Sequence, residues 1–273
     1  MGHRFTYVVS PEEERENLTV EWFLRRHGYS RHIITGLKRT EDGIFRNGVR
    51  AWTSQAVHAG DVIETHLVET EPSDGILPRP VPFSVVYEDD DILVVDKPAD
   101  TPIHPSIGNY ENTLANGIAW YFELAKHALS AAVLSQAMRS REIHRTYQAF
   151  ALGETAASGT IDAPIARLDG SLIQRTVDFA SGERSVTHYR TLAHCSVFSH
   201  LELNLETGRT HQIRVHMAYI GHPLLGDTLY NKTPGTFPRQ ALHSASLSFV
   251  HPITGEPLNF HAPLPEDMQN LLT

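Results

Sequence analysis

Apolar positions near the start of the chain recur with the spacing of two short helices. In LTVEWFLRRHGYSRHIITGLKR, Val20, Phe23 and Leu24 fall on one helical face. Gly28 is placed to end the first helix, and Ser30 is placed to cap the second. The pattern therefore predicts a pair of helices within residues 18–39.

A hairpin signal follows the helices. In GIFRNGVRA, Asn47-Gly48 separates two β-prone runs and predicts a type I′ turn, and AGDVIETHL adds a turn and another strand. These elements predict a small domain over residues 1–68. Residues 69–83 (ETEPSDGILPRPVPF) contain four prolines and no periodicity, which predicts an extended linker.

The remaining residues, 84–273, predict a second domain in which strands follow strands. VVYEDDDILVVDKP reads as two strands around an acidic turn, and ENTLANGIAWYF as a helix capped by Asn112. LSAAVLSQAM continues as a helix, and RTYQAFALG, SVTHYRTL and VFSHLELNLE read as strands. Because regular crossover helices are missing, we expect an α+β fold with a mainly antiparallel sheet.

The last of these strands leads into a helix. Residues 197–206 alternate between apolar and polar positions, as a strand with one buried face does. TGRTHQIRVHMAYIGHP then predicts a turn at Gly208, a cap at Thr210 and a helix that stops at Gly221.

Composition adds one unexpected feature. The chain has 273 residues, 41% hydrophobic and 20% charged, which is typical of a globular protein, and its net charge is −9. Yet between Trp22 and Trp52 seven basic residues face two acidic ones. This basic segment indicates either a nucleic-acid surface or a solvated charged face. The single cysteine, Cys195, and the lack of a signal-peptide pattern favour the cytoplasm.

Common catalytic and metal-binding signatures are missing from the sequence, including GxxxxGK[ST], GxGxxG, HExxH and CxxC. His211 and His216 are five residues apart, about 140° around a helix, so they do not share a face as zinc ligands would. We therefore expect no metal.

Three stretches resemble the RluA-type RNA pseudouridine synthases. VVYEDDDILVVDKPADTPIHPS is similar to the first strand pair of that family, and REIHRTYQAFALG to its tyrosine strand. LELNLETGRTHQIRVHMAYIGHPLLGDTLY matches its GRTHQIR…G-P…GD..Y motif. Residues 18–67 resemble an S4 RNA-binding domain in element order and basic residues. The resemblance implies an enzyme that isomerises uridine to pseudouridine in structured RNA, in particular ribosomal RNA, without a cofactor. We expect it to be a cytoplasmic monomer.

The resemblance also assigns roles to single residues. Tyr147 would stack on the flipped uracil, which offsets part of the few kcal/mol that base flipping costs. Arg214 would pair with the catalytic aspartate, because a guanidinium grips a carboxylate with two parallel hydrogen bonds. Arg209 and Gln212 would either contact RNA phosphate or support the turn. The RNA contacts expected in the N-terminal domain are Arg25, Arg26, Arg31, Lys38, Arg39 and Arg46.

The chain departs from the family at its catalytic aspartate. The family carries it in an HRLDxxTSG-like motif, but here the helix ENTLANGIAWYF runs directly into ELAKHALSAAVLSQAM, as if a segment near residues 123/124 were deleted. Asp169 follows the tyrosine strand instead of preceding it, and Asp169-Gly170 reads as a turn. Asp96 and Asp227 also read as structural, so the nucleophile is missing.

Three interpretations remain open at this point. The chain is an impaired enzyme, an RNA-binding protein on a pseudouridine synthase scaffold, or an enzyme that uses another carboxylate. Without the nucleophile, Arg214 would lack its partner, and stranding one member of a buried ion pair costs about 3–5 kcal/mol. We therefore expect a less stable second domain that binds an anion at Arg214.

Overall fold

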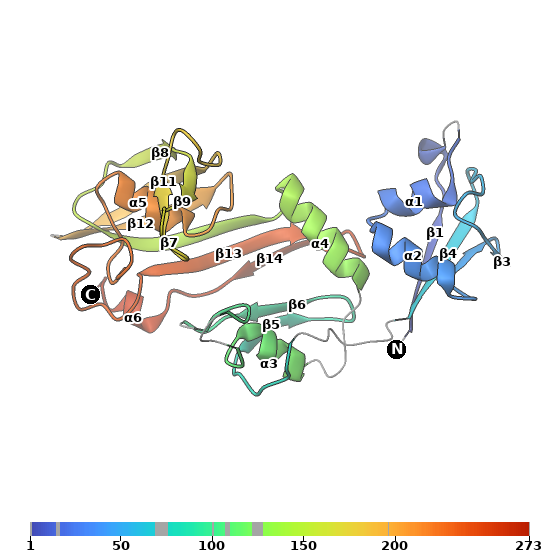
Figure 1. Cartoon of the computed structure of the whole chain (residues 1–273), viewed down its shortest axis with the longest axis horizontal. Coiled ribbons are helices and arrows are strands. Elements are labelled where there is room, and N and C mark those ends of the chain that lie inside the picture. Colours follow the sequence, from blue (N-terminus) through green and yellow to red (C-terminus); the bar gives the residue numbers. More distant parts are fainter. Residues whose placement is uncertain are drawn as a thin grey trace. The chain divides into compact units, whose positions relative to one another are not determined.

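The computed structural model describes residues 2–14, 17–68, 76–99, 101–106, 110–121, 128–195 and 197–272 (Figure 1). They form two compact units. The N-terminal unit comprises Met1–Ser140 with Pro252–Gly255, and the C-terminal unit comprises Arg141–His251 with Glu256–Thr273. None of the described helices has the length and apolar character needed to cross a membrane.

The N-terminal unit begins with the expected helix pair and hairpin. Helix α1 spans Val20–Arg26 and α2 spans Arg31–Arg39, with the Ser30 side chain capping α2 as predicted. Asn47 and Gly48 both have positive φ, 52° and 75°, as a type I′ turn requires. The turn joins β2 (Ile44–Arg46) to β3 (Val49–Arg50), and β4 (Val62–Val68) is the further strand expected.

One strand of this module was not predicted. Strand β1 (Gly2–Val8) pairs antiparallel with β4 at the edge of a sheet of order β1-β4-β2-β3. Its alternating Phe5 and Tyr7 pack against the core formed by the two helices. The alternation of apolar and polar residues in this stretch is itself a strand signal.

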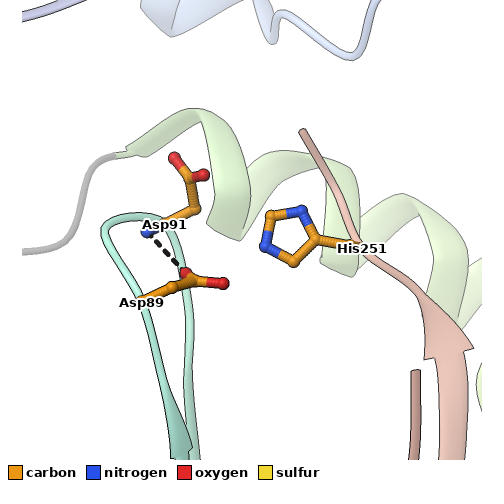
Figure 2. Close-up of side chains that lie close together, drawn as sticks. All are labelled: Asp89, Asp91 and His251. Carbon is orange, nitrogen blue, oxygen red and sulfur yellow. Dashed lines mark hydrogen bonds between the residues drawn. The ribbon is translucent and has the colours of Figure 1, made fainter. Parts of the chain in front are cut away.

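Residues 76–140 add a strand pair and two helices to the N-terminal unit. Strands β5 (Ser84–Glu88) and β6 (Leu93–Asp96) confirm the predicted pair. Between them the Asp89 carboxylate accepts the backbone N–H of Asp91 at 2.8 Å and that of Ile92 at 2.9 Å, so this acid shapes the turn (Figure 2). The linker predicted for 69–83 lies partly outside the described residues.

Both helices predicted in this region are present, as α3 (Leu114–Tyr121) and α4 (Ala128–Ser140). The cap predicted at Asn112 is wrong by one residue. The buried Thr113 hydroxyl accepts the N–H of Asn116, and the Asn116 side chain accepts the N–H of Thr113 in return. This reciprocal pair is a capping box, which satisfies two otherwise free donors.

The C-terminal unit is built on the antiparallel sheet that was expected. Its six strands lie in the order β14-β13-β7-β12-β11-β8. They are β7 (His144–Leu152), β8 (Ser158–Asp162), β11 (Val186–His194), β12 (Phe198–Leu205), β13 (Leu242–Val250) and β14 (Pro257–His261). The hairpin of β9 (Ile165–Arg167) and β10 (Arg175–Val177) and the helices α5 (Gln212–Tyr219) and α6 (Glu266–Gln269) complete the unit (Figure 1).

Each face of this sheet carries a core. Leu201 and Leu203 of β12 pack with Ile213 and Met217 of α5 on one face, and Phe150 packs with Met268 of α6 on the other. The alternation predicted for residues 197–206 is confirmed in part: Leu201 and Leu203 are buried and Asn204 is exposed. His200, expected on the polar face, is buried because the other face of the sheet also carries a core, and Val197 is exposed. Contacts on the first of these faces hold α5, which begins with the last three residues of the GRTHQIR motif, against the sheet.

Candidate functional site

Helix α5 begins differently from the prediction. The cap expected at Thr210 is wrong, because His211 takes the N-cap position in the left-handed conformation (φ 59°). The Gln212 side chain orders this turn, accepting from the Arg209 N–H at 3.0 Å and from the Thr207 hydroxyl at 2.8 Å. The predicted end of the helix is confirmed, since Gly221 has a φ of 87°.

Gln212 is itself buried, with 2% of its surface exposed. Its amide nitrogen donates to the Val186 carbonyl at 2.9 Å and to the Thr187 hydroxyl at 3.1 Å. Of the two roles left open for this residue, its geometry fits support of the turn. Arg209 is exposed, pairs with Glu183 and donates to the Arg184 carbonyl.

The expectation that Arg214 lacks a partner is wrong. Its Nε and Nη2 donate to the two carboxylate oxygens of Asp227, each at 2.7 Å. The Asp227 side chain is fully buried and that of Arg214 is 14% exposed. A bidentate contact of this kind is the strong form of the guanidinium–carboxylate pair. Asp227 comes from the GD..Y turn, thirteen residues further along the chain, so the ion pair joins α5 to that turn.

Asp227 also holds its own turn together. Its Oδ1 accepts the backbone N–H groups of Leu229 and Tyr230 at 3.0 and 3.1 Å. Burial raises the pKa of this carboxyl, but the Arg214 hydrogen bonds and charge, helped by the two N–H groups, outweigh burial and place the pKa below its ordinary value. Asp227 is therefore an ionised, structural group, as its motif indicated.

Tyr230 links the same turn to two other elements. Its hydroxyl accepts the Arg175 N–H of β10 at 2.9 Å and lies 2.8 Å from Nδ1 of His211, while its ring carries the Arg214 guanidinium carbon at 5.0 Å from the centroid. Burial lowers the pKa of His211, and the positive charges of Arg214 and Arg175 lower it further. The negative charge of Asp227 opposes these effects but does not outweigh them. A neutral imidazole can accept the tyrosine proton at Nδ1. Neither Tyr230 nor His211 was predicted as a site residue, although both lie in the quoted motif.

Tyr147 lies in the middle of the sheet. It is on β7 opposite Leu203 of β12, and it packs, partly buried, against the core that also contains α5 residues Ile213 and Met217. Ala149 and Ala151, two and four residues further, are buried in the same core, as the strand period requires. The structure therefore brings Tyr147 to the sheet face that carries α5.

The other carboxylates considered for catalysis have structural positions. Asp169 is exposed at the turn of the β9–β10 hairpin, where Gly170 has a φ of 76°. Asp96 is exposed at the end of β6. Asp227 uses both oxygens on four donors and is buried. A nucleophile must be reached by the substrate, and the Asp227 side chain is fully buried, so this geometry disfavours Asp227 for that role.

Buried histidines predict an acid-sensitive C-terminal unit. His216 is fully buried between Thr187 and the Ala163 carbonyl, and burial lowers the pKa values of His200, His211 and His216 from 6.5. Below about pH 6.5 these histidines bind protons in the unfolded state but not in the folded state. The free energy of unfolding is therefore highest above about pH 6.5 and falls as the pH decreases below that value. Urea unfolding at pH 7.5 and 5.5 should show a lower midpoint at pH 5.5. Equal midpoints would contradict this.

The basic residues of the N-terminal unit differ in their contacts. Arg46 is bound to the nearly buried Asp61 at 2.8 Å. Arg25 and Lys38 both contact Glu21, and the Arg26 guanidinium lies over the Trp22 ring at 5.6 Å. Arg31 and Arg39 are exposed on α2. The guanidinium of Arg50, two residues beyond Gly48 of the hairpin turn, lies over the Trp52 ring at 5.8 Å from the centroid.

Comparison with known proteins shows the family of this chain. The family model described as RNA pseudouridylate synthase matches residues 123–219, which include Tyr147 and Arg214. An uncharacterized RNA pseudouridine synthase of Bacillus subtilis, YjbO, is 37% identical over 279 residues, which cover 93% of this chain and 98% of that relative. The chain therefore belongs to the RNA pseudouridine synthase family, whose members are isomerases.

Other relatives carry more specific names. Ribosomal large subunit pseudouridine synthase D of Escherichia coli K12 is 37% identical over 241 residues, 75% of this chain and 74% of its own. Among solved structures, human RNA pseudouridylate synthase domain containing 1 matches with a TM-score of 0.55 at 25% identity, over 71% of this chain and 86% of that one. Human RNA pseudouridylate synthase domain containing 4, at 19% identity and the same TM-score, covers 69% and 91% and shares the fold.

Proposed function

We propose that this chain binds structured RNA, and in particular ribosomal RNA, through an S4-like module at residues 1–68. Tyr147 and Arg214 form the pocket for the target uridine, but the nucleophilic aspartate of the family is absent from it. The chain is then an RluA-type pseudouridine synthase with impaired turnover. The observation that carries the proposal is the partner of Arg214. The carboxylate bound there is Asp227, which is buried and hydrogen-bonded at both oxygens.

The alignments support a missing segment. The match to the E. coli relative runs over 241 residues but covers 75% of this chain, and three quarters of 273 residues is fewer than 241. The alignment therefore contains positions that have no counterpart here. The match to the B. subtilis relative, over 279 residues, is longer than the whole chain. The family model also begins to match at residue 123, beside the expected junction, which itself lies outside the described residues.

The RNA partner is supported by the relatives and by the basic module. Relatives with similar sequences are named for the large ribosomal subunit. The exposed cations Arg31 and Arg39 of α2 fit contacts to phosphate, and Trp22 and Trp52 beside arginines fit contacts to bases. A cytoplasmic monomer is the simplest form of this proposal.

RNA binding and C5–tritium release, measured together, test the proposal. We expect the chain to retain a labelled ribosomal RNA fragment on filters and to release no tritium from uridine labelled at C5. Replacing Arg31 and Arg39 by Gln should weaken binding and reduce the salt slope by roughly 0.7–0.9 for each lost phosphate contact. Arg190→Gln, which removes an exposed cation paired with Glu202 at 3.0 Å in the C-terminal unit, serves as a control.

Each outcome separates the interpretations. Failure to bind RNA contradicts the proposed partner. Tritium release that Asp169→Ala abolishes would mean that Asp169 is the nucleophile after all. Release that persists in Asp169→Ala would point to another carboxylate. Binding without release is the expected result.

A further inference from the structure

An open hollow of about 590 Å³ lies on the N-terminal module. Its walls come from α1, α2 and the segment after β3, with Trp22, Arg25, Lys38 and Ser54 among the residues that line it. The backbone fixes these walls, because the Glu21 N–H donates to the Thr53 carbonyl at 2.9 Å. The hollow therefore combines two cations, a carboxylate, an indole and three hydroxyl groups in one place.

Glu21 occupies the centre of this charge pattern. Its Oε1 accepts from Nε and Nη2 of Arg25 at 3.2 and 3.0 Å, and its Oε2 lies 3.5 Å from Nζ of Lys38. Arg25 belongs to the same helix, but Lys38 comes from α2, so this carboxylate joins two elements. The hydrogen bond from Arg25, followed by the charge of Lys38, lowers the pKa of Glu21, which is therefore ionised at neutral pH.

A carboxylate between an arginine and a lysine has the chemistry of a bound phosphate. Arginine recognises both groups with the same planar set of donors. The side chains of Glu21, Arg25 and Lys38 remain 37%, 46% and 43% exposed, so a ligand can reach them from solvent. Trp22 also lines the hollow, and the Arg26 guanidinium lies over its ring at 5.6 Å from the centroid.

We propose that the hollow is a binding position for an RNA backbone phosphate, and that Glu21 occupies this position in the free protein and weakens RNA binding. The inference rests on the proposed RNA-binding function of this module and adds the residue that sets its affinity. An RNA phosphate binds here by displacing Glu21 from Arg25 and Lys38. Because the phosphate only replaces the Glu21 carboxylate as partner of the two cations, a polyanion that contacts nothing else gains little binding free energy from them.

Glu21→Gln tests the inference by fluorescence anisotropy with a fluorescein-labelled ribosomal RNA stem-loop over a series of salt concentrations. The expected result is binding about two- to tenfold tighter than that of the parent at 0.1 M salt, since two exposed ion pairs are released. The slope of the logarithm of the RNA affinity against the logarithm of the salt concentration should become more negative by roughly 0.7 for each cation that then contacts a phosphate. Glu41→Gln is the matched control, because it removes the same charge from an exposed position outside the hollow.

A second background separates direct competition from net charge. In Arg25→Gln/Lys38→Gln protein, Glu21→Gln should no longer tighten binding, because the cations that it masks are gone. An equal gain in Glu41→Gln, or a gain that persists without the two cations, overturns the inference. So does unchanged affinity in Glu21→Gln when the parent binds RNA and Arg25→Gln weakens it. Failure of every variant and the parent to bind RNA would instead contradict the proposed function itself.

Discussion

Asp227→Asn is expected to lower the free energy of unfolding of the C-terminal unit by about 3–5 kcal/mol. The substitution removes the charge that Arg214 faces at two 2.7 Å contacts and leaves that guanidinium, 14% exposed, without a counter-ion. It also replaces one of the two accepting oxygens by an NH2 group, so the amide cannot accept from both Arg214 Nε and the N–H groups of Leu229 and Tyr230 as the carboxylate does. Turn, helix start and hairpin meet at this point, so the loss affects the whole unit.

The arrangement of tryptophans makes the measurement selective. All three, Trp22, Trp52 and Trp120, belong to the N-terminal unit. Tryptophan fluorescence in urea should therefore report a transition that Asp227→Asn leaves nearly unchanged, while hydrogen exchange at β7 and β12 amides should show the C-terminal unit opening more readily. Glu202→Gln, which breaks the exposed pair with Arg190, is the control and should change stability by less than about 1 kcal/mol.

A cycle with Arg214→Gln distinguishes the ion pair from local repacking. If the pair is the cause, Asp227→Asn should cost much less in the Arg214→Gln background, because no charge is then left unpaired. Equal costs in both backgrounds would mean that the turn N–H groups carry the effect. Unaltered hydrogen exchange in Asp227→Asn would contradict the role of the pair altogether.

Sequence patterns predicted the elements of this protein better than their ends. The Ser30 cap, the Asn47-Gly48 turn and the Gly221 stop were predictable because each depends on one residue's own backbone or side-chain preference. The start of α5 was not, because the buried Gln212 orders it through contacts with Arg209 and Thr207. The cap of α3 moved from Asn112 to Thr113 for a similar reason, since Thr113 has a reciprocal partner in Asn116.

The motifs singled out candidate residues, but they did not predict which of these residues pair with each other. Arg214 and Asp227 were both recognised in the sequence, and the first was expected to be stranded while the second was placed in a turn. The two residues lie thirteen positions apart, one in a helix and the other in a loop. Neither hydrophobic periodicity nor secondary-structure propensity predicts which side chains come into contact over such a separation. When a partner is sought for a charged residue of a motif, the oppositely charged residues of the same motif are therefore the first candidates.

Insertion of the segment that we propose to be missing is expected to produce tritium release that the parent chain, under the same proposal, lacks. A segment with the HRLDxxTSG-like motif of the family, placed between Glu123 and Leu124, supplies a carboxylate at the chain position where the resemblance expects it. Loss of an enzyme nucleophile typically reduces turnover by about 10⁴–10⁶-fold, so tritium release from C5-labelled uridine should rise from background to a measurable rate. The same insertion with its aspartate replaced by asparagine is the matched control and should release none.

The result depends on whether the rest of the pocket is intact. If Tyr147 and Arg214 have kept their roles, Tyr147→Phe in the active chimera should alter turnover while RNA binding stays close to that of the chimera itself. Asp169→Ala should leave the chimera active, because Asp169 lies at an exposed hairpin turn. A chimera that folds and binds RNA but releases no tritium would contradict the view that the nucleophile alone is missing. Arg214, already held by Asp227, would then be the next residue to question, because the inserted aspartate must share that guanidinium or displace Asp227 from it.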